Sequence, residues 1–589
     1  MKIKIVSLMF FMLFGSLLKI SAQITTREKP ISLELRSKTD LEELVSIELE
    51  TPDLQRIAEE DKIKDVFSGA QRFAYPVLTN FNLKNSGSWI ILEDGCRLWR
   101  LNLVLPGALS THTIYNKFWL PDGAKFFVYN EKTQSFIGAV TSEFIDGTFE
   151  NPESYSTGIL LGENVTFEYY QPATVKEKPI IEISRIDYGY RFINHIIDAV
   201  GHSKKGDVFQ NTGFDWAGWC QVNINCPEGN NWQYEKNAVA RIKNVFPKGS
   251  SWVSGALVNN ARNDYTSYFL TANHCLIDAY NDAFDVLGNN DLKDWIFYWS
   301  YEASGCNNPH FTNEPQHYST RGATIIANDS PSDFALLKLK EDPRTLSNYG
   351  VTPYYLGWDA TGSPGGHNGV CIHHPKGDIK KISTYGSIPI SVIAHNNPNP
   401  NGNFWSVVWI ETLNGRHGVT EGCSSGSPLI NSNRKIIGQL FGGRSQCGDD
   451  ITIGANTWGK NQPDRFGKFS VSWNANSIPQ RQLKHWLAPA PSTTTVLNGI
   501  GFTNNCNLII VSGLEPPASE TYKFVICKNI NVQNATVPTG KRLDLIATES
   551  ITVDGITVNS GATLELNSVG SVKINSGFVI QSGASFIIR

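Results

Sequence analysis

The 589-residue sequence lacks a large net charge of either sign. It has 51 Lys and Arg residues against 55 Asp and Glu residues, which gives a formal net charge of −4. Because the overall charge is close to zero, nothing electrostatic favours a nucleic acid or an acidic membrane surface as a partner. Long apolar runs are also absent after residue 22, so we expect no membrane span.

The only long apolar run lies at the start of the chain. Two lysines precede the apolar residues 5–18, and a Ser-Ala pair ends the segment. This pattern is typical of a secretory signal peptide over residues 1–22, and its apolar part is too short to span a bilayer. We therefore expect a secreted, extracellular protein in which the ten cysteines can form disulfides.

The remaining sequence is typical of folded, mainly β structure. Hydrophobic residues make up 41% of the chain, and 50 glycines interrupt alternating runs of β-branched and aromatic residues. Prolines and polar stretches divide the chain into parts. We expect a signal peptide (1–22), an N-terminal unit built as a β-sandwich (23–205), a central region of short strands typical of a double β-barrel (206–488), and a linker with a short last domain (489–589).

The last domain contains a weak internal repeat. Residues 556–566 resemble residues 572–580, and each copy joins alternating strand residues to a glycine turn. This favours a small β-solenoid or sheet stack, with an ordinary β-meander as the alternative. We expect a Cys506–Cys527 disulfide here, and attachment to the cell surface is a role that we consider for this domain.

Three separate stretches predict a site for acyl transfer. Residues 422–428 read Gly-Cys-Ser-Ser-Gly-Ser-Pro, which suits a tight turn that exposes a hydroxyl and directs N–H groups at one point. Serine and glycine clusters are usually plain loops, but two further stretches change the interpretation. Residues 271–275 contain His274 and residues 332–337 contain Asp333, each at the edge of a strand-like segment. A nucleophilic hydroxyl needs a base and an orienting carboxylate, and all three are present.

The region from about Trp219 to Pro489 resembles the lysyl endopeptidases of the chymotrypsin-like serine protease clan. The resemblance implies a double β-barrel made as a secreted precursor, with the N-terminal unit as its propeptide. Its motifs are C-P-E-G at 226–229, S-G-A-L-V-N-N at 254–260, Y-F-L-T-A-N-H-C at 268–275, I-H-H-P at 372–375, G-V-T-E at 418–421, G-S-P at 426–428, I-G-Q-L at 437–440 and F-G-K at 466–468.

The resemblance implies a role for each residue of the triad. Ser425 is the nucleophile, with Ser424 as the competing candidate. His274 is the general base and then the acid, and Asp333 holds its tautomer. The backbone N–H groups of Cys423 and Ser425 are the expected oxyanion hole. The neighbouring pair at 373–374, both histidines, is interpreted as structural.

Substrate choice is expected to depend on Asp464, which matches the lysine-recognising aspartate of the family. The alternative is that Asp464 pairs with Arg465 or Lys468 on a surface turn. An aromatic pair is expected near the triad, and a glycine-rich edge is expected to bind extended substrate backbone. The residues assigned to this substrate-binding rim are His395, Phe441, Gly442, Gly443 and Ser445.

The cysteines depart from the family pattern at two places. Cys423 stands where the family usually has glycine, and Val253 replaces the usual partner of Cys275. We expect a Cys275–Cys423 disulfide, the alternatives being a free Cys275 with Cys423 paired to Cys371 or unpaired. The resemblance also implies two further disulfides, Cys220–Cys447 and Cys226–Cys306.

These expectations combine into a secreted serine endopeptidase, made as a zymogen, that cleaves after lysine. Its partners are protein or peptide substrates with lysine at the cleaved position and its own propeptide, which it could release by cutting after Lys204-Lys205. No metal or organic cofactor is expected. The alternatives are a broader Lys/Arg preference and an inactive protease homologue that acts as an extracellular binding or adhesion protein.

Overall fold

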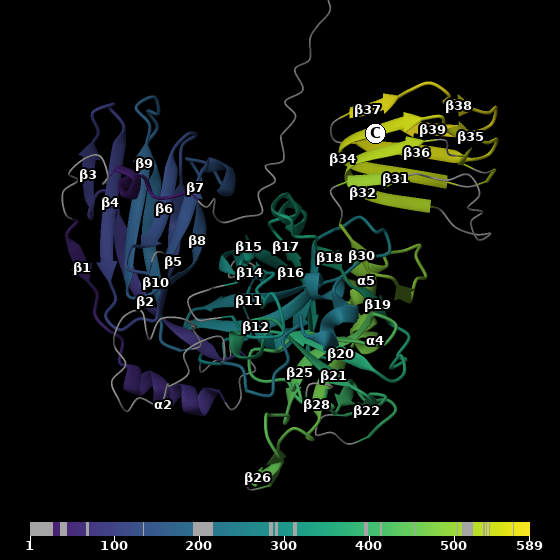
Figure 1. Ribbon diagram of the computed structural model, residues 1–589, viewed down its shortest axis with the longest axis horizontal. Coiled ribbons are helices and arrows are strands. Elements are labelled where there is room, and N and C mark those ends of the chain that lie inside the picture. The colour runs from purple at the N-terminus through teal and green to yellow at the C-terminus, as the bar shows by residue number, and fades with distance from the viewer. Residues whose placement is uncertain are drawn as a thin grey trace, which may run out of the picture.

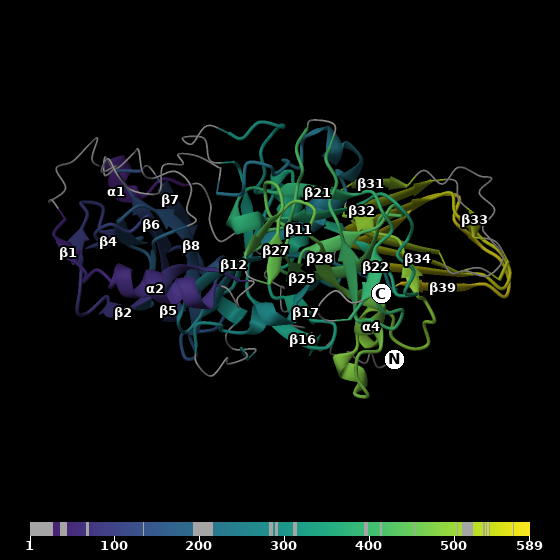
Figure 2. The ribbon, with the colours of Figure 1, turned by 90° about the horizontal axis from the view of Figure 1, so that it is seen from below.

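A computed structural model shows three parts that follow one another along the chain (Figure 1). In both views the N-terminal unit and the C-terminal strands lie at opposite ends, with the central region between them (Figure 2). Among the described residues, no helix is long and apolar enough to cross a membrane. The structure describes residues 28–35, 44–65, 70–191 and 216–588, except for 134, 282–286, 289–291, 310–314, 394–397, 413–414, 454, 503–504, 509–521, 534–535, 538, 541 and 569–570. The expected signal peptide lies outside this part of the chain.

The N-terminal unit contains two sheets that share one apolar cluster. The first has the strand order β1-β4-β9-β6-β7 with β3 paired to β4, and the second is the β2-β10-β5-β8 part of a larger sheet. Trp99 and Phe167 from the first sheet pack with Tyr115 and Ile183 from the second, as the predicted sandwich requires. The elements are α1 (Ile31–Leu35), β1 (Ser46–Glu48), α2 (Leu54–Lys64), β2 (Arg72–Asn82), β3 (Ser88–Ile91), β4 (Arg97–Val104), β5 (Ser110–Trp119), β6 (Lys125–Asn130), β7 (Ser135–Val140), β8 (Glu153–Leu161), β9 (Asn164–Gln171) and β10 (Ile180–Gly189).

The central region carries two antiparallel sheets. Its first half runs β16-β17-β13-β12-β11-β14-β15, and its second half runs β21-β20-β24-β25-β28-β23-β22. The hydrogen-bond ladders close neither sheet into a ring within the described residues. The strands are β11 (Val239–Phe246), β12 (Gly249–Leu257), β13 (Tyr268–Ala272), β14 (Ile296–Trp299), β15 (Tyr318–Arg321), β16 (Ala323–Asp329), β17 (Phe334–Leu339), β20 (Gly369–His373), β21 (Lys381–Tyr385), β22 (Ile390–Val392), β23 (Phe404–Val407), β24 (Pro428–Ile430), β25 (Lys435–Gly443) and β28 (Asp464–Lys468), followed by the short helices α4 (Phe469–Trp473) and α5 (Leu483–Leu487).

One strand joins the N-terminal unit to the central region. Strand β2 pairs antiparallel with β12, placing Ala74 opposite Ser250 and Arg72 opposite Ser251, so a single sheet runs through both parts. All nine residues of β12 are buried. A central strand that is covered on both faces has buried side chains at every position, rather than buried and exposed side chains in alternation.

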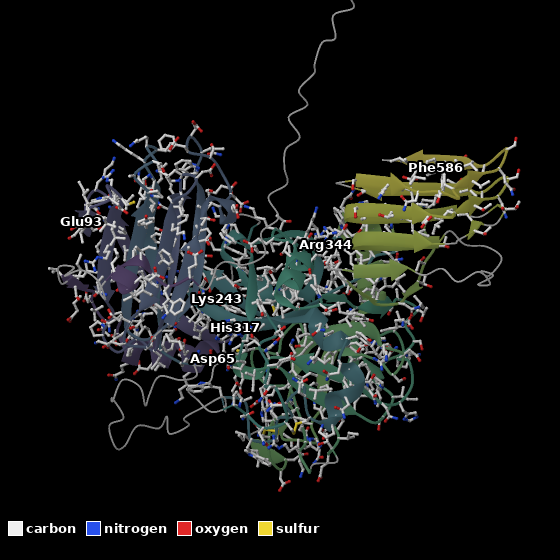
Figure 3. All side chains as sticks on the ribbon, turned by 45° about the horizontal axis from the view of Figure 1, so that its top comes forward. Asp65, Glu93, Lys243, His317, Arg344 and Phe586 are labelled. Carbon is white, nitrogen blue, oxygen red and sulfur yellow. A yellow bond between two sulfur atoms is a disulfide. The ribbon has the colours of Figure 1, made fainter. Side chains whose placement is uncertain are left out.

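Buried charges lie at the same junction. Lys243 of β11 approaches two residues of the N-terminal unit, with Nζ 2.8 Å from Nδ1 of His112 and 3.4 Å from Oδ2 of Asp187. Figure 3 labels Lys243 where the strands of the two parts meet. The predicted domain boundary at residue 205 falls outside the described residues and stays a prediction.

The C-terminal strands stack in parallel. Arg542 pairs with Thr563, and Thr563 pairs with Ser585, so each strand lies about one repeat from the next. Parallel pairing agrees with the expected sheet stack and not with a meander, in which neighbours would be antiparallel. The strands are β31 (Asn505–Leu508), β32 (Tyr522–Gln533), β34 (Arg542–Asp554), β36 (Thr563–Ser568), β37 (Ser571–Ile574) and β39 (Ser585–Ile588), with the smaller β33 (Thr536–Val537), β35 (Thr557–Val558) and β38 (Val579–Ile580).

Candidate active site

The ring of His274 is held by Asp333. His274 follows β13 in a short 3-10 turn, and its Nδ1 lies 2.7 Å from Oδ2 of Asp333. The backbone N–H of His274 donates to Oδ1 of the same carboxylate at 2.9 Å, and the N–H of Asn273 donates to the carbonyl of Asp333. Burial lowers the pKa of His274, but the charge and hydrogen bond of Asp333, together with the neighbouring Cys275, raise this pKa well above its ordinary value. With Nδ1 bound to the carboxylate, Nε2 is the atom left for chemistry.

Asp333 is in an unusual backbone conformation. Its φ is 55°, and it follows β16 in the turn that enters β17. Its N–H donates to the carbonyl of Ser330 at 3.1 Å. The left-handed conformation is uncommon outside glycine and asparagine or aspartate residues, and here it allows both carboxylate oxygens to reach His274.

The two serines of the 422–428 turn have different surroundings. The hydroxyl of Ser424 is buried and lies 2.8 Å from Nδ1 of His373. Burial lowers the pKa of His373 to about 3, so this ring is a neutral structural group. The hydroxyl of Ser425 has no hydrogen-bond partner among the residues that the structure describes. Ser425 is therefore the serine with an available hydroxyl.

The serine turn packs against the strand that leads to His274. Gly426 has a φ of 84°, and a Cβ added to it would lie 2.1 Å from Oγ1 of Thr271 and 2.9 Å from the backbone nitrogen of Ala272. Only glycine allows this approach. The carbonyl of Ser425 also accepts the N–H of Ser254, on the strand next to β13, at 3.0 Å.

The turn is also linked to the histidine ring through strand β25. Gly426 donates its N–H to the carbonyl of Leu440, and the next residue, Phe441, lies edge-on to His274 with ring centroids 6.0 Å apart. Nε2 of His274 is buried and has no partner among the described residues. The turn that carries Ser425 thus packs against the strand that leads to His274, and no hydrogen bond joins the Ser425 hydroxyl to Nε2 of His274.

The N–H groups of the turn alternate between paired and unpaired. Ser424 and Gly426 donate to the carbonyls of Glu421 and Leu440. Those of Cys423 and Ser425 have no acceptor within the described part of the chain. The N–H groups of Cys423 and Ser425 are therefore available as donors, and an oxyanion is stabilised by N–H groups that are already in place.

Asp464 is buried at the start of β28, 1% exposed. Its Oδ2 accepts hydrogen bonds from Nε1 of Trp409 at 2.7 Å, from Oγ1 of Thr420 at 2.6 Å and from the hydroxyl of Ser445. Burial raises the pKa of Asp464 above its ordinary value, and the hydrogen bonds oppose this shift.

The alternative surface pairing of Asp464 does not occur. The guanidinium of Arg465 lies 4.8 Å from the centroid of the Phe441 ring, and Lys468 donates to the hydroxyl of Ser391. The structure therefore places Asp464 in the interior and its two basic neighbours elsewhere.

The rim residues are only partly brought together. Gly443 lies against Asp464, because a Cβ on Gly443 would be 1.9 Å from Oδ1, and Ser445 hydrogen-bonds Asp464 directly. Phe441 contacts His274 and Phe404. Gly442 has a φ of 144° and open space around the position of a Cβ. His395 lies outside the described residues, so the expected aromatic pair is not seen.

Two of the disulfides have the expected pairing. Cys220 bonds to Cys447 and Cys226 bonds to Cys306. The side chains of Cys506 and Cys527 lie outside the described part of the chain. The Cys506–Cys527 disulfide therefore stays a prediction.

The expected Cys275–Cys423 disulfide is wrong, since both cysteines are free and buried. The physical reason is that they face different cores. Cys275 packs with Val253 in the core of the central region, whereas Cys423, at a φ of 71°, turns its side chain into the cluster of the N-terminal unit with Phe73 and Trp252. Cys371 is also free and buried.

Sequence reasoning missed two residues that contact Asp464. Thr420 belongs to the G-V-T-E motif, which carried the family resemblance without a role for this residue. Trp409 stands two residues after β23 and belongs to no motif. An unassigned hydroxyl in a quoted motif was the only available signal, because a lone tryptophan is usually a core residue.

The two antiparallel sheets, the His274–Asp333 pair and the neighbouring turn of Ser425 are the arrangement expected of a chymotrypsin-like serine protease. The sequence pattern described as "Lysyl endopeptidase, C-terminal domain" matches residues 214–459. A lysyl endopeptidase of Pseudomonas aeruginosa strain PAO1 is 28% identical over 375 residues, which cover 61% of this chain and 72% of that protein. Residues 214–459 thus match the lysyl endopeptidase family, and the chain is similar to a lysyl endopeptidase.

Solved structures of serine proteases are more distant. A protease from Mycobacterium tuberculosis in its active form is 16% identical, covering 42% of this chain and 80% of that chain with a TM-score of 0.25. A thermostable serine protease from an extremophilic microorganism is 12% identical, covering 40% and 92% with a TM-score of 0.25. These scores are low, so the assignment depends on the family pattern and the relative.

Proposed function

We propose that the protein is a secreted serine endopeptidase, made as a zymogen, that hydrolyses peptide bonds on the carboxyl side of lysine. The observation that carries the lysine preference is the buried carboxylate of Asp464, which lies against Gly443 at the expected substrate edge. A charge removed from water attracts an ammonium group more strongly than a surface charge does.

The proposed reaction uses the triad in two steps. Oγ of Ser425 attacks the carbonyl carbon of the peptide bond while Nε2 of His274 takes the hydroxyl proton. The N–H groups of Cys423 and Ser425 bind the oxyanion, and Asp333 stabilises the imidazolium. His274 then gives its proton to the leaving amine, which breaks the C–N bond and leaves an acyl-enzyme. His274 then deprotonates a water molecule that attacks the ester carbonyl, and the imidazolium returns this proton to Oγ of Ser425 as the C–O bond breaks and the acid is released.

The N-terminal unit is the proposed propeptide. Two of its features support this role: β2 hydrogen-bonds to β12, and the side chain of Gln71 lies beside Gly422, where a Cβ would be 2.6 Å from Oε1. The unit therefore contacts the turn that carries Ser425. Lys204-Lys205, in the connection between the two parts, is the proposed site of self-processing, and the N-terminal sequence of the purified mature protein tests it.

Two measurements on the processed protein test the proposed activity. A fluorophosphonate probe is expected to label the wild type and not Ser425→Ala. A peptide library is expected to be cut after lysine. Absence of labelling would instead favour the inactive binding or adhesion protein, and labelling with equal cutting after lysine and arginine would favour the broader specificity.

A further inference from the structure

The two oxygens of Asp464 differ in their hydrogen bonding. Oδ2 accepts from Trp409, Thr420 and Ser445, whereas Oδ1 accepts only the backbone N–H of Ser445, at 3.1 Å. A carboxylate has about four acceptor positions, two on each oxygen. Oδ2 therefore has no position left, and Oδ1 has one.

The open position is on the oxygen that lies beside the substrate edge. A Cβ on Gly443 would be 1.9 Å from Oδ1 and 2.7 Å from Cγ of Asp464. The backbone of residue 443 thus approaches Oδ1 with no side chain between them. A substrate group that reaches Asp464 past Gly443 meets Oδ1.

A single open position distinguishes lysine from arginine. An ammonium is a compact charge that needs one acceptor from the carboxylate, whereas a guanidinium binds a carboxylate best through two parallel N–H groups, one to each oxygen. With Oδ2 occupied, the second N–H of arginine would be buried without a partner, which is costly.

Trp409 is the donor that keeps Oδ2 occupied. The hydroxyls of Thr420 and Ser445 can rotate and can also accept, but an indole N–H is only a donor. The ring of Trp409 is 2% exposed and packs edge-on to Phe466 with centroids 6.0 Å apart, so it is fixed in place. We propose that Trp409 is a positioning residue that makes the site select lysine over arginine by occupying Oδ2 of Asp464. This inference rests on the proposed function.

The test compares two tryptophan variants. Trp409→Phe keeps an aromatic ring and removes the donor to Asp464. Trp405→Phe is the matched control, because Trp405 is buried in the same cluster but donates its Nε1 to the carbonyl of Ile437 at 3.1 Å. For each protein, kcat and KM are measured on two peptides that differ only in lysine or arginine before the cleaved bond, and thermal unfolding checks the fold.

The ratio of kcat/KM for lysine over arginine is expected to fall at least about tenfold in Trp409→Phe, with the change mainly in KM. The ratio is expected to stay within about twofold of wild type in Trp405→Phe. A folded Trp409→Phe enzyme with the wild-type ratio would overturn the inference, and so would an equal fall in both variants.

A second pair keeps the test decisive if Trp409→Phe does not fold. Thr420→Val removes one of the two hydroxyl donors to Oδ2, whereas Thr420→Ser keeps a hydroxyl there. The ratio is expected to fall only in Thr420→Val, and equal ratios in both would overturn the inference. A wild-type enzyme without lysine preference would overturn the proposed function together with the inference, whereas a wild type that prefers lysine and is unaffected by these changes refutes the inference alone.

Discussion

Replacing Asp464 by asparagine turns one hydrogen-bond acceptor at the base of the proposed pocket into a donor. The three donors to Oδ2 fix where the amide oxygen of the asparagine must lie. The amide NH2 group then takes the place of Oδ1, beside Gly443 and opposite the N–H of Ser445. A lysine ammonium that formerly met an acceptor would meet a donor.

The expected loss follows from this geometry. Removing one partner of a buried, hydrogen-bonded charge pair costs about 2–5 kcal/mol, which is about 30-fold to several thousandfold in kcat/KM. Hydration cannot replace the lost acceptor, because Asp464 is 1% exposed. The substrate profile should lose its preference for lysine at the same time.

The assay measures kcat/KM on a lysine peptide and the library profile for wild type and Asp464→Asn. Asp449→Asn is the matched control, since Asp449 is 90% exposed and pairs with Lys460 on the neighbouring loop. The control removes the same charge and should change kcat/KM by less than about twofold. An Asp464→Asn enzyme that keeps its lysine preference, or that loses no more activity than the control, would remove Asp464 from substrate recognition.

Two further predictions concern the triad and the junction with the N-terminal unit. Asp333→Asn should lower kcat by about 10⁴-fold, because the amide no longer holds the His274 tautomer whose Nε2 accepts a proton, and it should leave KM nearly unchanged; an effect on KM alone would contradict this. Burial lowers the pKa of His112 to about 4, so the folded chain binds fewer protons at this ring than the unfolded chain does between pH 6.5 and 4. The contribution of this ring to the free energy of unfolding is complete above pH 6.5 and is expected to fall by about 3 kcal/mol as the pH drops to 4. Urea unfolding of His112→Gln beside wild type, with a smaller loss in the variant, checks the sign.

The sequence supplied the chemistry of the site more readily than its surroundings. His274, Asp333 and a serine could be predicted because each lies where a strand-like run ends, and because their order and spacing match a known pattern. The choice of Ser425 over Ser424 depended on that resemblance. In the structure it depends on His373, whose ring binds the hydroxyl of Ser424. That contact joins residues 51 positions apart, and no local pattern predicts it.

The shared sheet between the N-terminal unit and the central region could not be predicted from the sequence. The pairing of β2 with β12 is made by backbone groups, which every residue carries, so the side chains give little indication of the partner. No sequence pattern predicts the buried lysine at this junction either. Lys243 stands in a strand whose residues are all buried, and its partners His112 and Asp187 come from two different strands of another unit.

Cys423 shows how the two parts of the chain depend on each other. At a φ of 71°, a Cβ is expected to cost about 1 kcal/mol or more relative to glycine, yet the sequence keeps a cysteine at a donor position of the proposed oxyanion hole. The side chain is fully buried in a cluster that the N-terminal unit shares with β12 and β14 of the central region. Burial raises the pKa of this thiol to about 12, so it stays protonated and serves as an apolar contact rather than a nucleophile. The contacts that offset the strain therefore come in part from the N-terminal unit, through Phe73, which lies more than 300 positions earlier in the chain.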